Sequence, residues 1–310
     1  MPSPPASPAP ERGLLPRIFL SSDENRLRAG WRLLAHLILL GVCALLFGAV
    51  ITLPLMLTGN MPPVDDLVLN QAIFMLSVTA STFIARRWID RRAISSLGLR
   101  WDGSAARDLL VGVGIGGVIM AAIFLIEWGA GWLTLFGAAW QFRPPLEVMG
   151  STLIMLAVFV LVGWNEELLV RGYWLQNMAD GTNLTWGVLL SASIFALLHL
   201  GNPNVSAIAI VGLFLAGVFL AYGYVRTRQL WLSIGLHIGW NFFENTVFGF
   251  PVSGLDTPGL LVHNVAGPEW FTGGAFGPEA GLVAVLGMGL GAWLISLYTR
   301  GRIVRDAPVG

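Results

Sequence analysis

Long apolar runs separated by short polar segments dominate the chain. A helix needs about 20 apolar residues to cross the hydrocarbon core of a bilayer, and about eight runs approach or exceed that length. They lie near residues 31–57, 67–85, 109–135, 148–170, 184–200, 205–225, 229–248 and 279–298. This pattern predicts an all-α, polytopic membrane protein with about eight transmembrane helices.

The polar segments between the runs are too short to bury a core of their own. We therefore expect a single transmembrane helical domain over residues 21–300. The proline-rich start, residues 1–20, predicts a disordered tail, and residues 301–310 predict a short C-terminal tail. Residues 249–278, rich in glycine and proline, form the longest segment between runs, and we expect it to be partly ordered.

Composition supports the membrane interpretation. The mean hydropathy is +0.71, and 55% of the residues are hydrophobic against 12% charged, which excludes an ordinary soluble domain of this length. The net charge is zero, so no excess of basic residues indicates a nucleic-acid partner. Cys43 is the only cysteine, which excludes an internal disulfide and a thiolate metal cluster.

The basic residues indicate the orientation of the chain. All 18 are arginine, and they gather before the first run, between the second and third, between the sixth and seventh, and after the eighth. Cytoplasmic loops carry an excess of basic residues, so these segments should share the cytoplasmic side. The opposite loops contain only Arg143. We expect both termini to be cytoplasmic and the protein to be multi-pass in the inner (plasma) membrane.

Two adjacent carboxylates and an arginine stand at the end of the fourth apolar run. Glu167 and Arg171 are four residues apart, so on a helix they can pair on one face. Glu166 is rotated by about 100° from Glu167 and has no charged partner on its own helix. Ionisable groups inside a membrane are costly and usually functional, which makes Glu166 a candidate general base. A purely structural ion-pair network is the alternative.

Two later helical pairs contain histidines. Phe195 and His199 are four residues apart in the fifth run, so their rings should lie one above the other. His237 and Asn241 have the same spacing in the seventh run, and Glu244 falls on the same stripe. Such a polar stripe on an apolar helix indicates either a cavity or a buried hydrogen-bond network. The remaining polar groups in apolar surroundings have no companions at catalytic spacing, and we interpret them as structural: His36, Asn70, Gln71, Glu127 and His263.

Taken in order, Glu166-Glu167-x-x-x-Arg171, Phe195-x-x-x-His199 and His237-x-x-x-Asn241 resemble the three motifs of the CPBP family of intramembrane proteases. This family includes the eukaryotic CAAX prenyl endopeptidase and the bacteriocin-immunity proteins of bacteria, also called the Abi family. The resemblance covers residues 148–250, which would be the catalytic core. Segments 96–100 and 249–254 also resemble bacterial members, more weakly.

The resemblance implies hydrolysis of a peptide bond in a membrane-associated peptide or protein. By the matching positions, Glu166 would activate water with support from His199. His237 and Asn241 would stabilise the oxyanion of the scissile carbonyl. Supporting roles would fall to Glu167, Arg171 and Phe195.

A metal is the main open choice within this interpretation. Glu166, His199 and His237 could ligate Zn²⁺ and leave one position for water. The spacing is not that of the His-Glu-x-x-His zinc proteases, and the ligands would come from three helices. We therefore favour glutamate-activated water and expect no cofactor.

Two other classes of protein compete with a protease. A small transporter would also bury acids and histidines, but it should show a repeat between its halves, and the sequence shows none. A non-catalytic immunity or binding member of the same family is the second. For Glu166 to meet His199, either the fourth helix continues well beyond Arg171 or the fifth starts in the cytoplasm, and we expect the former.

Overall fold

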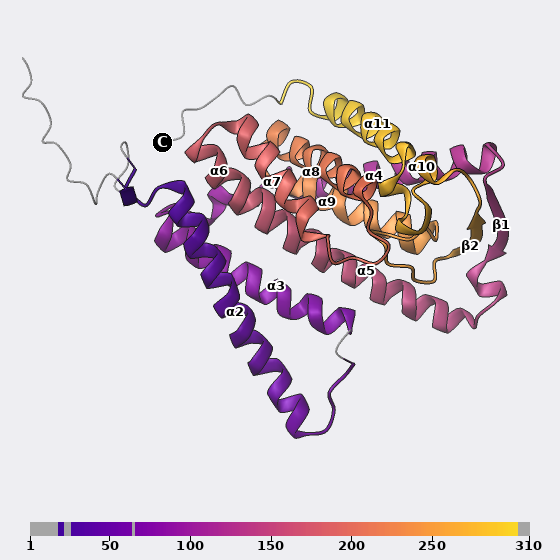
Figure 1. Cartoon of the computed structure of the whole chain (residues 1–310), viewed down its shortest axis with the longest axis horizontal. Coiled ribbons are helices and arrows are strands. Elements are labelled where there is room, and N and C mark those ends of the chain that lie inside the picture. Colours follow the sequence, from indigo (N-terminus) through magenta and orange to yellow (C-terminus); the bar gives the residue numbers. More distant parts are fainter. Residues whose placement is uncertain (1–17, 22–25, 64–65, 303–310) are drawn as a thin grey trace, which may run out of the picture.

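The computed structural model describes residues 18–21, 26–63 and 66–302, so most of the two predicted tails lies outside the described residues. The fold is mostly helical, at 73% of the residues. Its longer helices are α2 (Ala29–Leu57), α3 (Leu67–Ile84), α4 (Ala105–Gly129), α5 (Pro145–Glu167), α6 (Leu175–Gly181), α7 (Leu184–Leu198), α8 (Ala207–Thr227), α9 (Trp231–Asn241) and α11 (Leu282–Tyr298). Figure 1 shows α2 and α3 as a hairpin that spreads away from the other helices toward its turn.

Among the described residues, five helical segments are long and apolar enough to cross a membrane. They are Ala29–Leu57, Leu67–Ile89, Ala105–Gly129, Pro145–Gly181 and Ala207–Thr227. Two shorter apolar helices, α7 and α11, accompany them. The chain is therefore a multi-pass membrane protein, while a total of eight spans and cytoplasmic termini stay predictions.

We predicted one helix for the third apolar run, residues 109–135, and the structure differs at its end. The helix α4 ends at Gly129, and Gly131 adopts a positive φ of 75°, which favours glycine and turns the chain. Strand β1 (Leu133–Ala138) follows and pairs antiparallel with β2 (Leu261–Val265). This two-stranded sheet was not expected of an all-α protein, because both strands lie in segments whose apolar residues carry no clear alternation.

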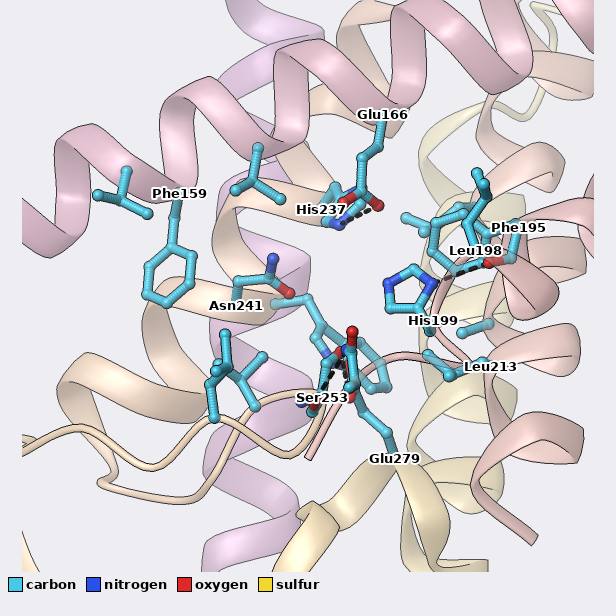
Figure 2. Close-up of a pocket in the computed structure, with 18 of the residues that line it drawn as sticks. Phe159, Glu166, Phe195, Leu198, His199, Leu213, His237, Asn241, Ser253 and Glu279 are labelled. Carbon is cyan, nitrogen blue, oxygen red and sulfur yellow. Dashed lines mark hydrogen bonds and ion pairs between the residues drawn. The ribbon is translucent and has the colours of Figure 1, made fainter. Parts of the chain in front are cut away.

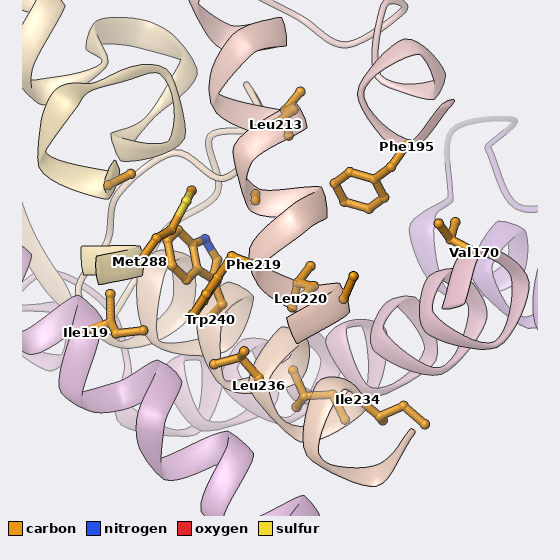
Figure 3. Packing of buried hydrophobic residues seen from close by; sticks show 14 of the residues in the cluster. Ile119, Val170, Phe195, Leu213, Phe219, Leu220, Ile234, Leu236, Trp240 and Met288 are labelled. Carbon is orange, nitrogen blue, oxygen red and sulfur yellow. The ribbon is translucent and has the colours of Figure 1, made fainter. Parts of the chain in front are cut away.

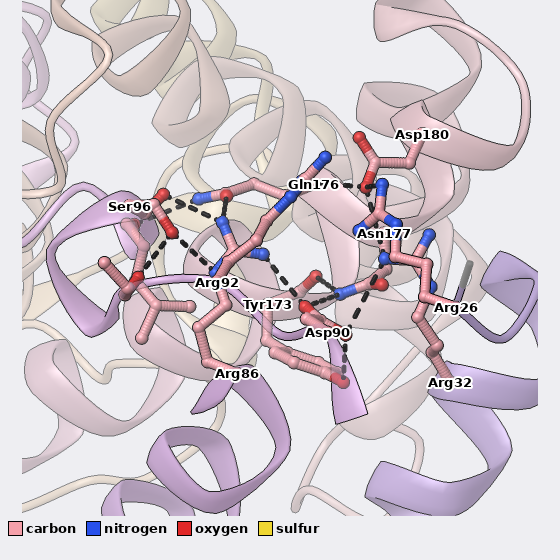
Figure 4. A network of polar contacts seen from close by, with 12 residues as sticks. Arg26, Arg32, Arg86, Asp90, Arg92, Ser96, Tyr173, Gln176, Asn177 and Asp180 are labelled. Carbon is pink, nitrogen blue, oxygen red and sulfur yellow. Dashed lines mark hydrogen bonds and ion pairs between the residues drawn. The ribbon is translucent and has the colours of Figure 1, made fainter. Parts of the chain in front are cut away.

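The fourth helix continues past Arg171, as predicted. After α5, a π-helical segment (Leu168–Trp174) leads without a break into α6, and the whole helical segment spans 37 residues. A polar network binds α6 to the ends of α2 and α3 (Figure 4). Its centre is Asp90, which accepts hydrogen bonds from Arg86 (2.9 Å), Tyr173 (3.0 Å) and Asn177 (3.2 Å). The arginine-rich segment after α3 thus anchors the extended fourth helix.

The apolar core lies among α4, α8, α9 and α11 (Figure 3). Helices α4 and α9 approach each other at Gly112 and Gly116 on one side and at Gly235 and Gly239 on the other. A methyl group on any of these four would collide with backbone atoms of the facing helix. Lipid tails are as apolar as the helices, so the hydrophobic effect does not drive helices together in a membrane. Helices there associate through such close packing of small residues. Both pairs have the Gly-x-x-x-Gly spacing.

Residues 249–278 are ordered, and they contain β2 and the short helix α10 (Glu269–Thr272). Within this segment the His263 Nε2 atom donates to the Phe248 carbonyl at 2.8 Å. The centroid of the His263 ring lies 4.9 Å from that of the Phe250 ring, in an edge-on arrangement. Burial lowers the pKa of His263, which favours the neutral ring. These contacts agree with the structural interpretation of this histidine.

The glycine contact between α4 and α9 yields a stability prediction. We expect Gly239→Ala to lower the free energy of unfolding by about 1–3 kcal/mol, because its methyl group meets the Val113 backbone of α4. Gly114→Ala is the matched control, since a methyl group there meets open space. Unfolding by sodium dodecyl sulfate in mixed micelles measures both variants. Equal stability of the two variants would contradict the tight contact.

Candidate functional site

The first motif lies where α5 passes into the π-helical segment. Both Glu167 and Arg171 are fully buried, and the Arg171 Nη1 atom lies 2.8 Å from the Glu167 Oε1 atom. The pairing expected from their spacing is confirmed. A second nitrogen of Arg171 donates to the Gly217 carbonyl of α8 at 2.9 Å. This hydrogen bond of Arg171 links the fourth helix to α8.

Glu166 points to a different side of the helix. Its side chain is 24% exposed, and its Oε2 atom has no hydrogen-bond partner among the described residues. This Oε2 atom lies 3.8 Å from the His237 Nε2 atom. The acid that lacks a partner on its own helix therefore faces a histidine from another helix.

The second motif lies at the end of α7. His199 follows the last residue of the helix, and its Nδ1 atom lies 2.8 Å from the Phe195 carbonyl oxygen. A carbonyl oxygen only accepts, so Nδ1 donates, and Nε2 carries no proton in the neutral ring. The Phe195 ring lies 4.8 Å from the His199 ring and 4.6 Å from the Arg171 guanidinium carbon. Phe195 thus packs against both Arg171 of the first motif and His199 of its own motif.

The third motif lies on α9, and both of its polar residues are buried. The His237 Nδ1 atom lies 2.9 Å from the Glu167 Oε1 atom. Because a carboxylate accepts, Nδ1 donates and Nε2 faces Glu166. Glu167 thus contacts both Arg171 and His237, whereas the sequence indicated only the contact with Arg171. Nothing in helical spacing could reveal a contact between side chains 70 positions apart.

One cavity of about 360 Å³ brings the motifs together (Figure 2). Its lining includes all four residues predicted to be catalytic: Glu166, His199, His237 and Asn241. Most of the other lining side chains are apolar, and the majority of these come from α3, α5, α7, α8 and α9. The catalytic roles of the four residues stay predictions, but their convergence is the arrangement that a shared chemical step requires.

The cavity also contains polar residues that the sequence did not single out. Gln71, which we interpreted as structural, lines the cavity, and its Oε1 atom accepts a hydrogen bond from Asn165 at 3.1 Å. Ser253 and Glu279 line it from segments distant in sequence. Ser253 stands in the segment that weakly resembles bacterial family members, which was a usable signal. Glu279 gave no signal, because it stands alone at the start of an apolar run.

Glu244 does not share the cavity with His237 and Asn241, although a regular helix would put it on their stripe. The chain passes into a π-helical segment (Phe242–Val247) directly after Asn241. A π-helical turn contains more residues than an α-helical turn, so the stripe changes direction. Glu244 is fully buried and is not among the residues that line the cavity.

The same donors can be tested as a zinc site. Within the described ranges, no group of three or more histidine, cysteine, aspartate or glutamate side chains is placed to hold a metal ion. In each histidine the Nδ1 atom donates, to Phe195 in one case and to Glu167 in the other, so each Nε2 atom carries no proton in the neutral ring. Whether Glu166, His199 and His237 bind a metal stays untested, and we route no chemical step through one.

Comparison with known proteins agrees with the motifs. Residues 148–243 match the family model described as Rce1-like, Type II CAAX prenyl endopeptidase Rce1-like. This match supports membership of the CPBP family. The comparisons with curated proteins and with solved structures gave no match. The matched segment contains all three motifs, and it favours a protease over a transporter.

The buried ion pair yields a second stability prediction. We expect Glu167→Ala to lower the free energy of unfolding by about 3–5 kcal/mol, because it leaves Arg171 buried without its carboxylate. The control is Glu147→Ala on the same helix, which removes an exposed contact with Arg143 at 3.9 Å and should cost about 0–1 kcal/mol. Unfolding in mixed micelles compares the two. A loss in Glu167→Ala no larger than in the control would refute a stabilising role for the carboxylate.

Proposed function

We propose that this chain, as a member of the CPBP family, is an intramembrane endopeptidase of the CAAX type that hydrolyses a peptide bond with water activated by Glu166. One observation carries the proposal: Glu166, His199, His237 and Asn241 come from three separate helical segments and line one cavity. A structural ion-pair network accounts for Glu167 and Arg171, but it does not require an unpaired acid that faces the cavity.

Glu166 is the general base in this mechanism. Its carboxylate has no cation on its own helix to neutralise it, and it opens to the cavity where a water molecule and a peptide can meet. The carboxylate takes a proton from the water as the water oxygen attacks the scissile carbonyl carbon. The unprotonated His199 Nε2 atom accepts a hydrogen bond from the other hydrogen of the water.

Asn241 and His237 stabilise the negative charge that develops on the carbonyl oxygen. The side-chain amide of Asn241 can donate in any protonation state. His237 already donates its Nδ1 proton to Glu167, so its Nε2 atom can donate only when the ring carries two protons. The adjacent Glu166 and Glu167 carboxylates favour that form of the ring. Collapse of the tetrahedral intermediate breaks the C–N bond, and the proton held by Glu166 passes to the amine, which leaves a carboxylic acid and an amine as products.

The substrate is a membrane-associated peptide or protein. The cavity is lined mainly by apolar side chains and lies among helices that are apolar enough to cross a membrane. An extended peptide with apolar side chains fits this lining better than a charged soluble peptide. We place the protein in the inner (plasma) membrane, with the lipid bilayer as its second partner and no nucleic acid.

The first activity prediction concerns the base. Cells carrying Glu166→Gln should lack the new protein termini that wild-type cells generate in their membrane proteome, as measured by mass spectrometry of protein termini. A substrate identified in this way should be cleaved about 10²–10⁴-fold more slowly by the purified variant, because glutamine cannot accept the proton. Glu147→Gln, an exposed position on the same helix, should cleave at the wild-type rate. Cleavage by Glu166→Gln at the wild-type rate would rule out this mechanism.

The second activity prediction concerns metal. Purified enzyme dialysed against EDTA and 1,10-phenanthroline should keep its full rate of cleavage, since the proposed mechanism activates water with Glu166 and uses no metal. Elemental analysis of the same sample measures the residual zinc. Loss of activity on chelation that added Zn²⁺ restores would show that a metal takes part.

A further inference from the structure

Glu279 is a buried acid outside the three motifs and outside the segment that matches the family model. It lies in a short turn (Pro278–Ala280) directly before α11, and it is 5% exposed. Figure 2 shows it on the opposite side of the cavity from Glu166, pointing toward Ser253. The mechanism above uses neither residue, so their presence in the cavity wall needs its own explanation.

Two hydrogen bonds join these residues. The Glu279 Oε2 atom accepts from the Ser253 backbone nitrogen and from the Ser253 hydroxyl, both at 2.7 Å. Ser253 has a φ of +48°, which an L-residue other than glycine rarely adopts. Residues in such conformations persist where their surroundings hold them in place. The carboxylate supplies two bonds at this position.

Ser253 belongs to a tight turn that forms part of the cavity wall. Val252 and Leu255 close the turn with two backbone hydrogen bonds of 2.9 Å, and both side chains line the cavity. The Ser253 carbonyl accepts a hydrogen bond from Asn202 at 2.9 Å. The Asn202 backbone nitrogen in turn donates to the His199 carbonyl at 3.0 Å. The turn is therefore held by Glu279 on one side and by the segment after His199 on the other.

We propose that Glu279 is a positioning residue that holds the turn Val252–Leu255 in place at the cavity. The turn then forms the part of the wall that binds the substrate chain beside the scissile bond. The proposal rests on the peptidase function proposed above. The two apolar side chains of the turn favour an apolar substrate residue at that place. A loosened turn weakens binding of substrate and transition state equally, so it raises KM and leaves kcat unchanged.

The test uses Glu279→Ala, Glu279→Gln and Ser253→Ala in the full-length protein. Hydrogen exchange of residues 250–257 is measured without substrate, and KM and kcat are measured on the substrate found with the Glu166→Gln comparison. Glu279→Ala should speed exchange in this segment and raise KM by about tenfold or more, since it removes two hydrogen bonds to a carboxylate. Ser253→Ala removes one bond and should have a smaller effect. Glu279→Gln should stay close to wild type in both measurements, because its amide oxygen can accept both bonds.

Glu269→Ala is the matched control, as an exposed acid on α10 in the same part of the chain, and it should change neither measurement. The proposal is overturned if Glu279→Gln is as impaired as Glu279→Ala, because the charge itself would then be the requirement. Unchanged exchange in Glu279→Ala also overturns it. If Glu279→Ala does not fold, Ser253→Ala and Glu279→Gln decide the same question.

The two proposals fail in different ways. Hydrogen exchange reports whether Glu279 holds the turn, and it needs no cleavage. If Glu279→Ala speeds exchange as expected but the protein cleaves nothing, the positioning role of Glu279 is supported and the peptidase function is refuted. If Glu166→Gln abolishes cleavage but Glu279→Ala does not change the exchange, the peptidase function is supported and the positioning role of Glu279 is refuted.

Discussion

The arrangement of the site depends on one buried carboxylate, that of Glu167. A single oxygen of this group contacts Arg171 on its own helix and His237 on α9. A charge buried among apolar helices is costly unless it is paired and hydrogen-bonded, so the pair is stable only while these helices stay together. Because His237 donates one ring nitrogen to Glu167, the other nitrogen is directed at Glu166. The residue that holds the helices together also orients the ring on which the proposed chemistry depends.

Close packing and polar anchoring place the helices that this carboxylate joins. Gly235 and Gly239 let the backbone of α9 lie against α4, which sets the depth of His237 and Asn241 in the bundle. At the other end, Asp90 and its partners hold α6, so the fourth helix continues far beyond Arg171. In lipid neither arrangement can rely on the hydrophobic effect between helices, and both use contacts that lipid cannot replace.

Patterns within one helix were predicted well. The spacing of Glu167 and Arg171 indicated their ion pair, and the apolar runs indicated the helices, because neighbours on a helix are fixed by its 3.6-residue period. The prediction was wrong for the end of the third run, where Gly131 turns the chain into a strand, and a π-helical segment puts Glu244 outside the cavity that His237 and Asn241 line. Gln71 was interpreted as structural because it has no companion at catalytic spacing, yet it lines the cavity.

The sequence by itself determined that the chain is a multi-pass helical membrane protein with three short motifs in a fixed order, since composition and local spacing carry that information. Only the tertiary structure decided that Glu167 contacts His237 and that Ser253 and Glu279 close the cavity opposite Glu166. The physical reason is the distance along the chain. Contacts between residues tens of positions apart depend on how helices pack, and no periodicity within a segment encodes that packing.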